Sequence, residues 1–239
     1  MGVAVRAYYT TPRRDDYLES HLELWTRDDS GNRILMPGYG WLFPLEDGRT
    51  NVGLGTLDTT SAFQKTDYKD VMRRWVEDIN PEWQLEHDES AGPIRGAALP
   101  MGFNRSPLYA DGLLLVGDSG GMVNPFNGEG IDYALEAGRM AAETAVQALG
   151  RVPGPMRERV LEGYPAALDA TYGGYFTLGR VFAKMIGNPT FMKQATKYGL
   201  PRPTLMRFML KLMANLTDPH DGDVSDRIIN GLSKVAPRA

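Results

Sequence analysis

Five glycines and one aspartate stand close together in residues 117–130, GDSGGMVNPFNGEG, and this composition suits a ligand-binding loop. The apolar residues Leu113 to Val116 before it predict a strand buried on both faces, and Ile131 to Leu149 carry an alanine-rich helical pattern. Glycines let the main chain approach a ligand, and a helix N-terminus offers unpaired N–H groups and partial positive charge. Asp118 could accept hydrogen bonds from sugar-like hydroxyls. A tight turn that binds nothing is the alternative, which the many Gly, Asn and Pro residues disfavour.

The string GDSGG within this loop also surrounds the nucleophile of trypsin-like serine proteases. A catalytic triad needs a histidine and an acid brought to that serine. The three histidines lie in segments unlike the distinctive histidine segment of that family, Met122 replaces the usual following proline, and the chain has no cysteine for the common disulfides. We therefore do not interpret the string as a protease motif.

Composition places this 239-residue chain among ordinary globular proteins that bury a substantial core. The absence of cysteine excludes disulfides, thiolate chemistry and sulfur-ligated metals, and it favours a reducing, cytoplasmic setting. The three histidines lack metal-ligand spacing, so we expect no metal site. The sequence contains no run of about 18 apolar residues, so we predict no membrane-spanning helix.

The charge is distributed unevenly. Residues Thr171 to Thr217 contain seven Lys or Arg and no Asp or Glu, although the whole chain has a net charge of −4. Within Leu205 to Met213, LMRFMLKLM, the bases Arg207 and Lys211 share one side of a helix otherwise rich in methionine and leucine. We expect Thr171–Thr217 to contact an anionic membrane peripherally at its inner face, and we expect no nucleic-acid partner. The alternative is a buried helix with two snorkelling bases.

Hydrophobic periodicity predicts an antiparallel sheet in the first part of the chain and helices in the last part. Predicted strands occupy Val3–Tyr9, His21–Thr26, Arg33–Met36, Tyr39–Pro44, Thr50–Thr56 and Ile94–Leu99. Asp67 can cap a helix that Asn80-Pro81 should end. Further helices are predicted at Met156–Gly163, Ala166–Ile186 with a weak point at Gly173-Gly174, Thr190–Tyr198, Thr204–Leu216 and Val224–Val235. The fold class is therefore α+β.

Two motifs together carry a family resemblance. The first is YxWxFP followed by GxG, formed here by Tyr39, Trp41, Phe43 and Pro44, then eight residues, then Gly53-Leu54-Gly55. The second is a GD segment continued by NP and GEG, formed by Gly117-Asp118, Asn124-Pro125 and Gly128-Glu129-Gly130. In both motifs the chain resembles the geranylgeranyl reductase family of flavoproteins, part of the para-hydroxybenzoate hydroxylase-like FAD superfamily.

The resemblance implies two sets of site residues. FAD would contact Gly117, Asp118, Asn124, Pro125, Gly128, Glu129, Gly130 and Ile131, with Asp118 at the ribityl chain and the helix N-terminus at the pyrimidine edge of the flavin. A helix N-terminus there would stabilise the negative charge of reduced flavin. Tyr39, Trp41, Phe43, Pro44, Gly53 and Gly55 would line an apolar channel for a prenyl chain. Strand alternation places the three aromatic residues on one face, although ordinary core packing is the alternative.

The dinucleotide-binding GxGxxG turn with which such enzymes begin is missing from this sequence. We therefore expect the chain to correspond to the C-terminal portion of such an enzyme and to purify without stoichiometric flavin. The predicted domains are a substrate-binding sheet domain over residues 1–110, the last piece of the FAD-binding domain over 111–150, and a helical region over 151–239.

The implied activity is FAD-dependent reduction of isoprenoid C=C bonds in a prenyl lipid, such as a geranylgeranyl group or the side chain of menaquinone. The sequence identifies neither the electron donor nor a catalytic proton donor. Two alternatives stay open. One is a flavin-dependent monooxygenase, and the other is a catalytically incompetent fragment that binds lipid or membrane.

Overall fold

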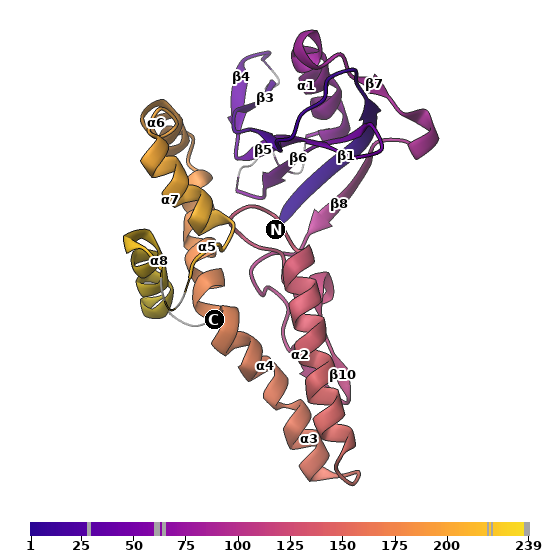
Figure 1. Cartoon of the computed structure of the whole chain (residues 1–239), viewed down its shortest axis with the longest axis vertical. Helices are drawn as coiled ribbons and strands as arrows, with labels where there is room; N and C mark the ends of the chain where they lie inside the picture. The colour runs from indigo at the N-terminus through magenta and orange to yellow at the C-terminus, as the bar shows by residue number, and fades with distance from the viewer. Residues whose placement is uncertain (28–29, 60–62, 64–65, 219, 221, 237–239) are drawn as a thin grey trace. The chain divides into compact units, whose positions relative to one another are not determined.

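The computed structural model of the chain describes residues 1–27, 30–59, 63, 66–218, 220 and 222–236 (Figure 1). The contacts divide it into two compact units. The first comprises residues 1–98 and 186–196, and the second comprises residues 99–185 and 197–239. Each unit has its own cluster of buried apolar side chains. The three predicted domain boundaries stay predictions.

An antiparallel sheet forms the first unit, with the strand order β2-β5-β6-β1-β7 and with β8 also pairing with β1. Its strands are β1 (Gly2–Thr10), β2 (Glu19–His21), β5 (Gly38–Pro44), β6 (Arg49–Leu57), β7 (Glu86–His87) and β8 (Arg95–Leu99). A separate ladder joins β3 (Leu24–Arg27) to β4 (Arg33–Met36). These strands confirm the predicted antiparallel sheet.

One predicted strand is wrong in its extent. The sequence favours a single strand over His21–Thr26, whereas the structure divides it between β2 and β3. The two halves have different partners, because His21 pairs with Gly40 of β5 and Leu24 pairs with Met36 of β4. Alternation of side chains within the segment could not show that its ends belong to different ladders.

The helix α1 (Tyr68–Trp83) begins as predicted, since the Asp67 side chain accepts hydrogen bonds from the main-chain N–H groups of Lys69 and Asp70. The prediction that Asn80-Pro81 ends this helix is wrong, because α1 continues to Trp83. Trp83 is fully buried in the core of the first unit, and the burial of such a side chain outweighs a proline in the last turn. The helix ends at Gln84, which has a left-handed conformation.

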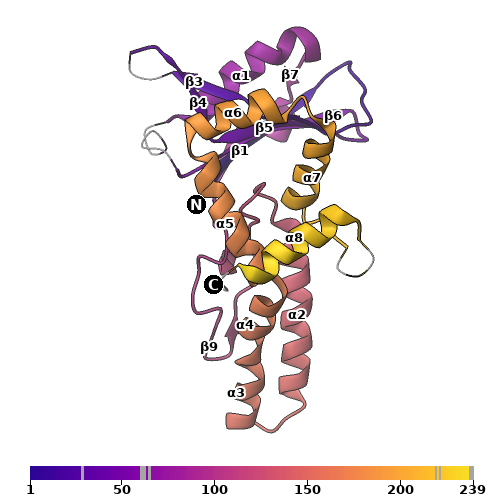
Figure 2. The same cartoon turned by 90° about the vertical axis from the view of Figure 1, so that its left-hand side faces the viewer.

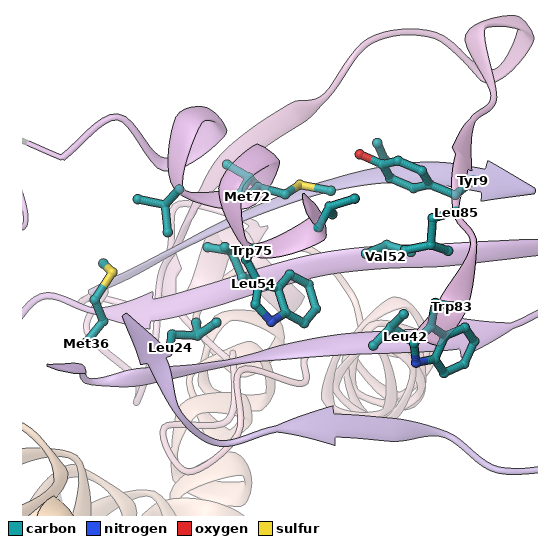
Figure 3. Packing of buried hydrophobic residues seen from close by; sticks show 14 residues of the cluster. Tyr9, Leu24, Met36, Leu42, Val52, Leu54, Met72, Trp75, Trp83 and Leu85 are labelled. Carbon is teal, nitrogen blue, oxygen red and sulfur yellow. The ribbon is translucent and has the colours of Figure 1, made fainter. Parts of the chain in front are cut away.

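The core of the first unit lies between α1 and one face of the sheet (Figure 3). The helix contributes Val71, Met72, Trp75 and Val76, and the sheet contributes Leu42, Val52 and Leu54, each 0% exposed. Because side chains of a strand alternate between faces, the neighbours of Leu42 point to the other face of the sheet. That other face carries the predicted aromatic row.

Helices dominate the second unit, namely α2 (Ile131–Leu149), α3 (Pro155–Leu161), α4 (Gly163–Leu168), α5 (Gly174–Ile186), α7 (Pro203–Met213) and α8 (Val224–Val235), while α6 (Pro189–Gly199) contributes residues to both units. The helix α2 lies beside α3 and α4, as both views show (Figure 2). The predicted weak point at Gly173-Gly174 is confirmed by a π-helical turn over Asp169–Gly173. The helix α7, predicted to reach Leu216, ends at Met213. Asn215, two residues later, has a left-handed conformation with a φ of 52°, which a helix cannot contain.

The strand predicted over Leu113–Val116 is largely wrong. Only Leu113 and Leu114 form a strand, β10, which pairs with β9 (Tyr109–Ala110). Leu113 is 62% exposed instead of buried. Within the described part of the chain β9 is the single partner of β10, so no layered sheet covers these leucines. The α+β class is confirmed, and the assignment of this segment to a remnant of an FAD-binding domain stays a prediction.

Along the part of the chain that the structure describes, no helix combines the length and the apolar character needed to cross a bilayer.

Candidate functional site

The glycine-rich loop begins with a 3-10 turn over Gly117–Gly120 and reaches α2 at Ile131. Gly117, Gly121 and Gly128 have φ values of +55°, +71° and +78°, which disfavour other residues. A Cβ at Gly121 would also collide with the Asn104 side chain, and a Cβ at Gly117 would lie 2.9 Å from the Ala134 side chain. The loop therefore needs glycine at these positions both for its conformation and for close packing.

Asn124 closes the second half of this loop. Its main-chain N–H donates to the Glu129 carbonyl at 2.7 Å, and its carbonyl accepts from the Gly128 N–H at 2.9 Å. Its side-chain oxygen accepts from the Phe126 N–H at 2.9 Å. Because these hydrogen bonds close on one residue, the loop is held in shape before any ligand arrives.

The side-chain amide of Asn124, in a residue only 1% exposed, connects the loop to three helices. Its nitrogen lies 3.1 Å from the Tyr175 hydroxyl of α5, 3.3 Å from the Tyr133 hydroxyl of α2 and 3.1 Å from the Met213 carbonyl at the end of α7. The Tyr175 hydroxyl donates to the Leu212 carbonyl at 2.9 Å. Burial raises the pKa of Tyr175 to about 12 and raises that of Tyr133 as well, so both hydroxyls stay protonated. We call these residues the Asn124 hub.

The loop is also packed against α5. Gly179 allows this approach, because a Cβ there would collide with the Pro125 ring and lie 2.9 Å from the Phe126 ring. The Arg180 guanidinium donates to the Gly102 carbonyl at 2.7 Å, and the Gly102 N–H donates to the Val123 carbonyl at 3.0 Å. The buried part of the loop is thus fixed from both sides.

The exposed part of the loop meets the N-terminus of α2. The Glu129 carboxylate accepts from the Asp132 N–H at 2.9 Å, whereas the amides of Gly130 and Ile131 have no acceptor among the residues that the structure describes. A carboxylate oxygen of exposed Asp118 lies 3.6 Å from the position that a Cβ of Gly130 would take. Unpaired donors and an acid therefore stand together at this helix end, an arrangement that can bind a polar ring edge and a hydroxyl.

Ser119, the serine of GDSGG, serves the turn itself. Its hydroxyl donates to the Val116 carbonyl at 2.7 Å and accepts from the Val116 N–H at 3.1 Å. No histidine hydrogen-bonds to it among the described residues. This geometry agrees with the interpretation that the string is not a protease motif.

The aromatic row of β5 lies on the sheet face opposite the core. Ring centroids are 5.9 Å apart between Tyr39 and Trp41 and 6.0 Å apart between Trp41 and Phe43. The Trp41 indole N–H donates to the Asn51 side-chain oxygen at 3.1 Å. None of the three aromatic residues belongs to the core of the first unit. The prediction that the three aromatic residues share one face is confirmed. The alternative, that they pack in the core between the sheet and α1, is not confirmed.

The GxG of the first motif supports this row. Gly53 pairs with Trp41 and Gly55 pairs with Tyr39 in the β5–β6 ladder. A Cβ on Gly53 would overlap the Trp41 indole, so glycine is required for the ring to lie against β6. Pro44 ends β5 opposite Thr50. The six predicted substrate-lining residues are therefore neighbours on two adjacent strands.

The two sets of predicted residues lie in different units, the row in the first and the loop in the second. That they face one shared cavity stays a prediction. Sequence reasoning missed Tyr133, Tyr175 and Met213, which hold Asn124. These residues are far apart in the sequence, and no local pattern links a tyrosine of α5 to a loop about fifty residues earlier.

No family model matches this chain. It is 35% identical over 228 residues to the menaquinone reductase of Mycolicibacterium smegmatis, and the aligned region covers 95% of the chain and 53% of that protein. It is 34% identical over 242 residues to the menaquinone reductase of Mycobacterium tuberculosis, and the aligned region covers 99% of the chain and 55% of that protein. A digeranylgeranylglycerophospholipid reductase of Methanopyrus kandleri is 36% identical over 112 residues, 47% of the chain and 28% of that protein. The chain spans about half the length of the menaquinone reductases that it matches.

Solved structures show the same fold. A geranylgeranyl bacteriochlorophyll reductase-like protein of Thermoplasma acidophilum has a TM-score of 0.63 and 16% identity, with 97% of this chain and 54% of that chain covered. The FAD-dependent myxobacterial halogenase CndH has a TM-score of 0.58 and 18% identity, with 98% and 55% covered. The curated relatives confirm the resemblance to the geranylgeranyl reductase family, and the solved structures confirm the fold.

Proposed function

Starting from its homology to menaquinone and digeranylgeranylglycerophospholipid reductases, we propose that this chain supplies the substrate-binding sheet and the flavin-edge loop of an FAD-dependent oxidoreductase. The enzyme reduces isoprenoid C=C bonds of a prenyl lipid, with the menaquinone side chain as the leading substrate. Menaquinone reductases match over nearly the whole chain, whereas the phospholipid reductase matches over about half of it.

The observation that carries the cofactor assignment is the exposed end of the loop. The unpaired amides of Gly130 and Ile131 at the start of α2 fit the electron-rich pyrimidine edge of an isoalloxazine, and Asp118 beside them fits a ribityl hydroxyl. The left-handed glycines keep side chains away from a flat ring that approaches the main chain. In this assignment Asn124 acts indirectly, because its amide is used within the hub.

The aromatic row fits a prenyl chain. Three rings and two glycines on one face present apolar surface with few polar atoms, which suits an alkene without polar substituents. Because an isolated C=C bond offers no charge to stabilise, the row contributes by orienting the chain and excluding water. When bound, reduced FAD supplies a hydride to one alkene carbon, and a proton reaches the other carbon. No side chain of the two sites is assigned as that proton donor.

We further propose a peripheral membrane contact through α7 and the segments around it, at the inner face of the membrane. Leu205 and Leu210 of α7 are 41% and 63% exposed, and exposed Arg202 and Arg207 flank them. Lys211 is excluded from this surface, because it pairs with Asp223 and Asp226 of α8 at 3.0 and 2.8 Å. Exposed leucines beside exposed arginines are typical of helices that rest on anionic lipid.

The monooxygenase alternative has less support. Halogenases share the fold with this chain at low identity, which shows the architecture and not the reaction. The named curated relatives are reductases.

To test this function, the natural reading frame that contains these residues is expressed in a bacterial host. The host is one whose own menaquinone has a fully unsaturated side chain. Mass spectrometry of the extracted lipid should show a menaquinone that has gained two hydrogens in its tail. A tail that gains oxygen would support the monooxygenase instead. An unchanged menaquinone pool, with the protein present and folded, would contradict the proposed function.

A further inference from the structure

The outer face of the sheet has a regular arrangement that extends the aromatic row onto β1. The ladders of β5 with β6 and of β6 with β1 place residues in three cross-strand rows, Tyr39–Gly55–Ala4, Trp41–Gly53–Arg6 and Phe43–Asn51–Tyr8. Residues in one row lie side by side on the same face. Only a glycine therefore separates Arg6 from Trp41 in its row.

Two arginines approach the Tyr8 ring at this end of the face. The guanidinium carbons of Arg6 and Arg49 lie 4.9 and 5.0 Å from the ring centroid. Arg49 pairs with the Asp47 carboxylate at 2.6 Å. Half-buried Arg6 has no carboxylate within 4 Å among the residues that the structure describes. One guanidinium is thus compensated by an acid, whereas the other lies over an aromatic ring and has no ion pair in the described part of the chain.

Asn51 adds a second polar group between these arginines and the row. Its side-chain oxygen accepts the Trp41 indole N–H at 3.1 Å, so the N–H₂ group is the end of the amide left for a ligand. That N–H₂ has no acceptor in the described part of the chain. Donors without acceptors therefore gather where the apolar row ends.

We propose that Arg6, supported by Asn51, is the subsite for a carbonyl oxygen of a quinone head group whose prenyl tail lies along Tyr39, Trp41 and Phe43. This inference rests on the proposed function and deepens it, because it selects a quinone over a phospholipid. A flat head group also matches the ring faces of Tyr8 and Phe43, which flank Asn51 in its row.

A phosphate head group fits this place less well. Phosphate sites generally combine several charges with free main-chain N–H groups, as at helix N-termini and nests. Here β1 and β6 pair within one sheet, and the main-chain N–H groups of a sheet lie in its plane instead of pointing to its face. The second guanidinium, that of Arg49, is already neutralised. A single donor-rich side chain is sufficient for a neutral carbonyl.

The test keeps the prenyl tail constant and changes the head. Menaquinone-4, geranylgeraniol and geranylgeranyl diphosphate carry the same tail, and their binding to the whole protein is measured by quenching of tryptophan fluorescence in detergent. The variant Arg6→Gln is compared with Arg49→Gln, which removes a guanidinium from the same ring. We expect Arg6→Gln to weaken menaquinone-4 binding about tenfold and to leave geranylgeraniol unchanged. Arg49→Gln should change neither.

Four outcomes would overturn the inference. An equal loss for geranylgeraniol would mean that Arg6 only supports the fold, and a larger loss for the diphosphate would mean a phosphate subsite. Equal binding of menaquinone-4 by the wild-type protein and by Arg6→Gln would exclude a role of Arg6 and leave the proposed function intact. Failure of the wild-type protein to bind any of the three ligands would contradict both. Arg6→Lys, which keeps the charge, should recover part of the affinity only if the head-group contact is real.

Discussion

Gly53 lies directly under the indole ring of Trp41, so that a single methyl group on Gly53 would occupy the space of that ring. The same Cβ would also lie 2.6 Å from the Val5 carbonyl of β1. The contact explains why a glycine follows the aromatic row at this fixed spacing. It ties the position of the row to the main chain of β6.

Gly53→Ala should therefore displace Trp41 and destabilise the first unit by about 1 to 3 kcal/mol, the usual cost of overpacking. Denaturant unfolding followed by tryptophan fluorescence measures both effects. Gly231→Ala is the matched control, because a Cβ at this position in α8 meets nothing within 4 Å. The control should be neutral or slightly stabilising. A Gly53→Ala protein with unchanged stability and emission would show that Trp41 does not depend on this glycine.

Tyr175→Phe removes one hydroxyl from the Asn124 hub. The Asn124 amide and the Leu212 carbonyl would each lose a buried hydrogen bond, and we expect the free energy of unfolding to fall by about 1 to 3 kcal/mol. Flavin affinity should fall as well, since the hub holds the loop. Tyr172→Phe is the control, because the Tyr172 ring packs against Tyr133 and its hydroxyl has no hydrogen bond in the described part of the chain. Equal behaviour of the two variants would contradict a role for the hub.

The pairing of α7 with α8 should depend on pH. The Asp226 N–H and the Lys211 ammonium donate to Asp223 and hold the pKa of its carboxyl below the ordinary value. Stabilisation by Asp223 is therefore present above the ordinary carboxyl pKa and is lost as the pH falls through the lowered value. The pKa of Lys211 is raised by Asp226 and Asp223, so its contribution persists up to the ordinary lysine value and is lost above it.

Thermal unfolding between about pH 3 and pH 7 measures the acid limb of this dependence. Asp223→Asn keeps an N-cap side chain for α8 but cannot titrate, so its melting temperature should fall less steeply in acid. Parallel curves for the two proteins would mean that Asp223 does not contribute.

Membrane binding should depend on Arg202 and Arg207, which form no ion pair with any acid that the structure describes. Arg202→Gln combined with Arg207→Gln should reduce pelleting with liposomes that contain anionic lipid, and added salt should have a similar effect on the wild-type protein. Lys211→Gln is the comparison, because Lys211 already pairs with α8 and should matter little. Pelleting that is unaffected by both the double variant and salt would remove the electrostatic contact.

Local patterns predicted most of the elements and both motifs. Alternation in Tyr39–Phe43 and the asparagine and glycine content of the loop are local properties, so they were readable without knowing the pairing of distant segments. The cap at Asp67 and the π-helical break near Gly173 belong to the same class.

What failed depends on tertiary context. The helix α1 continues beyond Pro81 because Trp83 is buried, and Leu113 is exposed because no layer in the described part of the chain covers it. A local stretch of sequence reveals neither fact. Arg6 and Tyr175 were missed for a related reason. Their significance comes from the ladder that places Arg6 beside Gly53 and from the packing that brings Tyr175 to Asn124.

The most direct measurement of the central claim is anaerobic turnover by the purified protein from its natural reading frame. The assay contains FAD reduced with dithionite and menaquinone-4, and tandem mass spectrometry locates the added hydrogens in the ring or in the tail. We predict that the tail gains two hydrogens without oxygen and that Trp41→Ala and Gly130→Val, one change in each predicted site, both abolish this gain. A tail that stays unsaturated, or one modified only after air is admitted, would contradict the account.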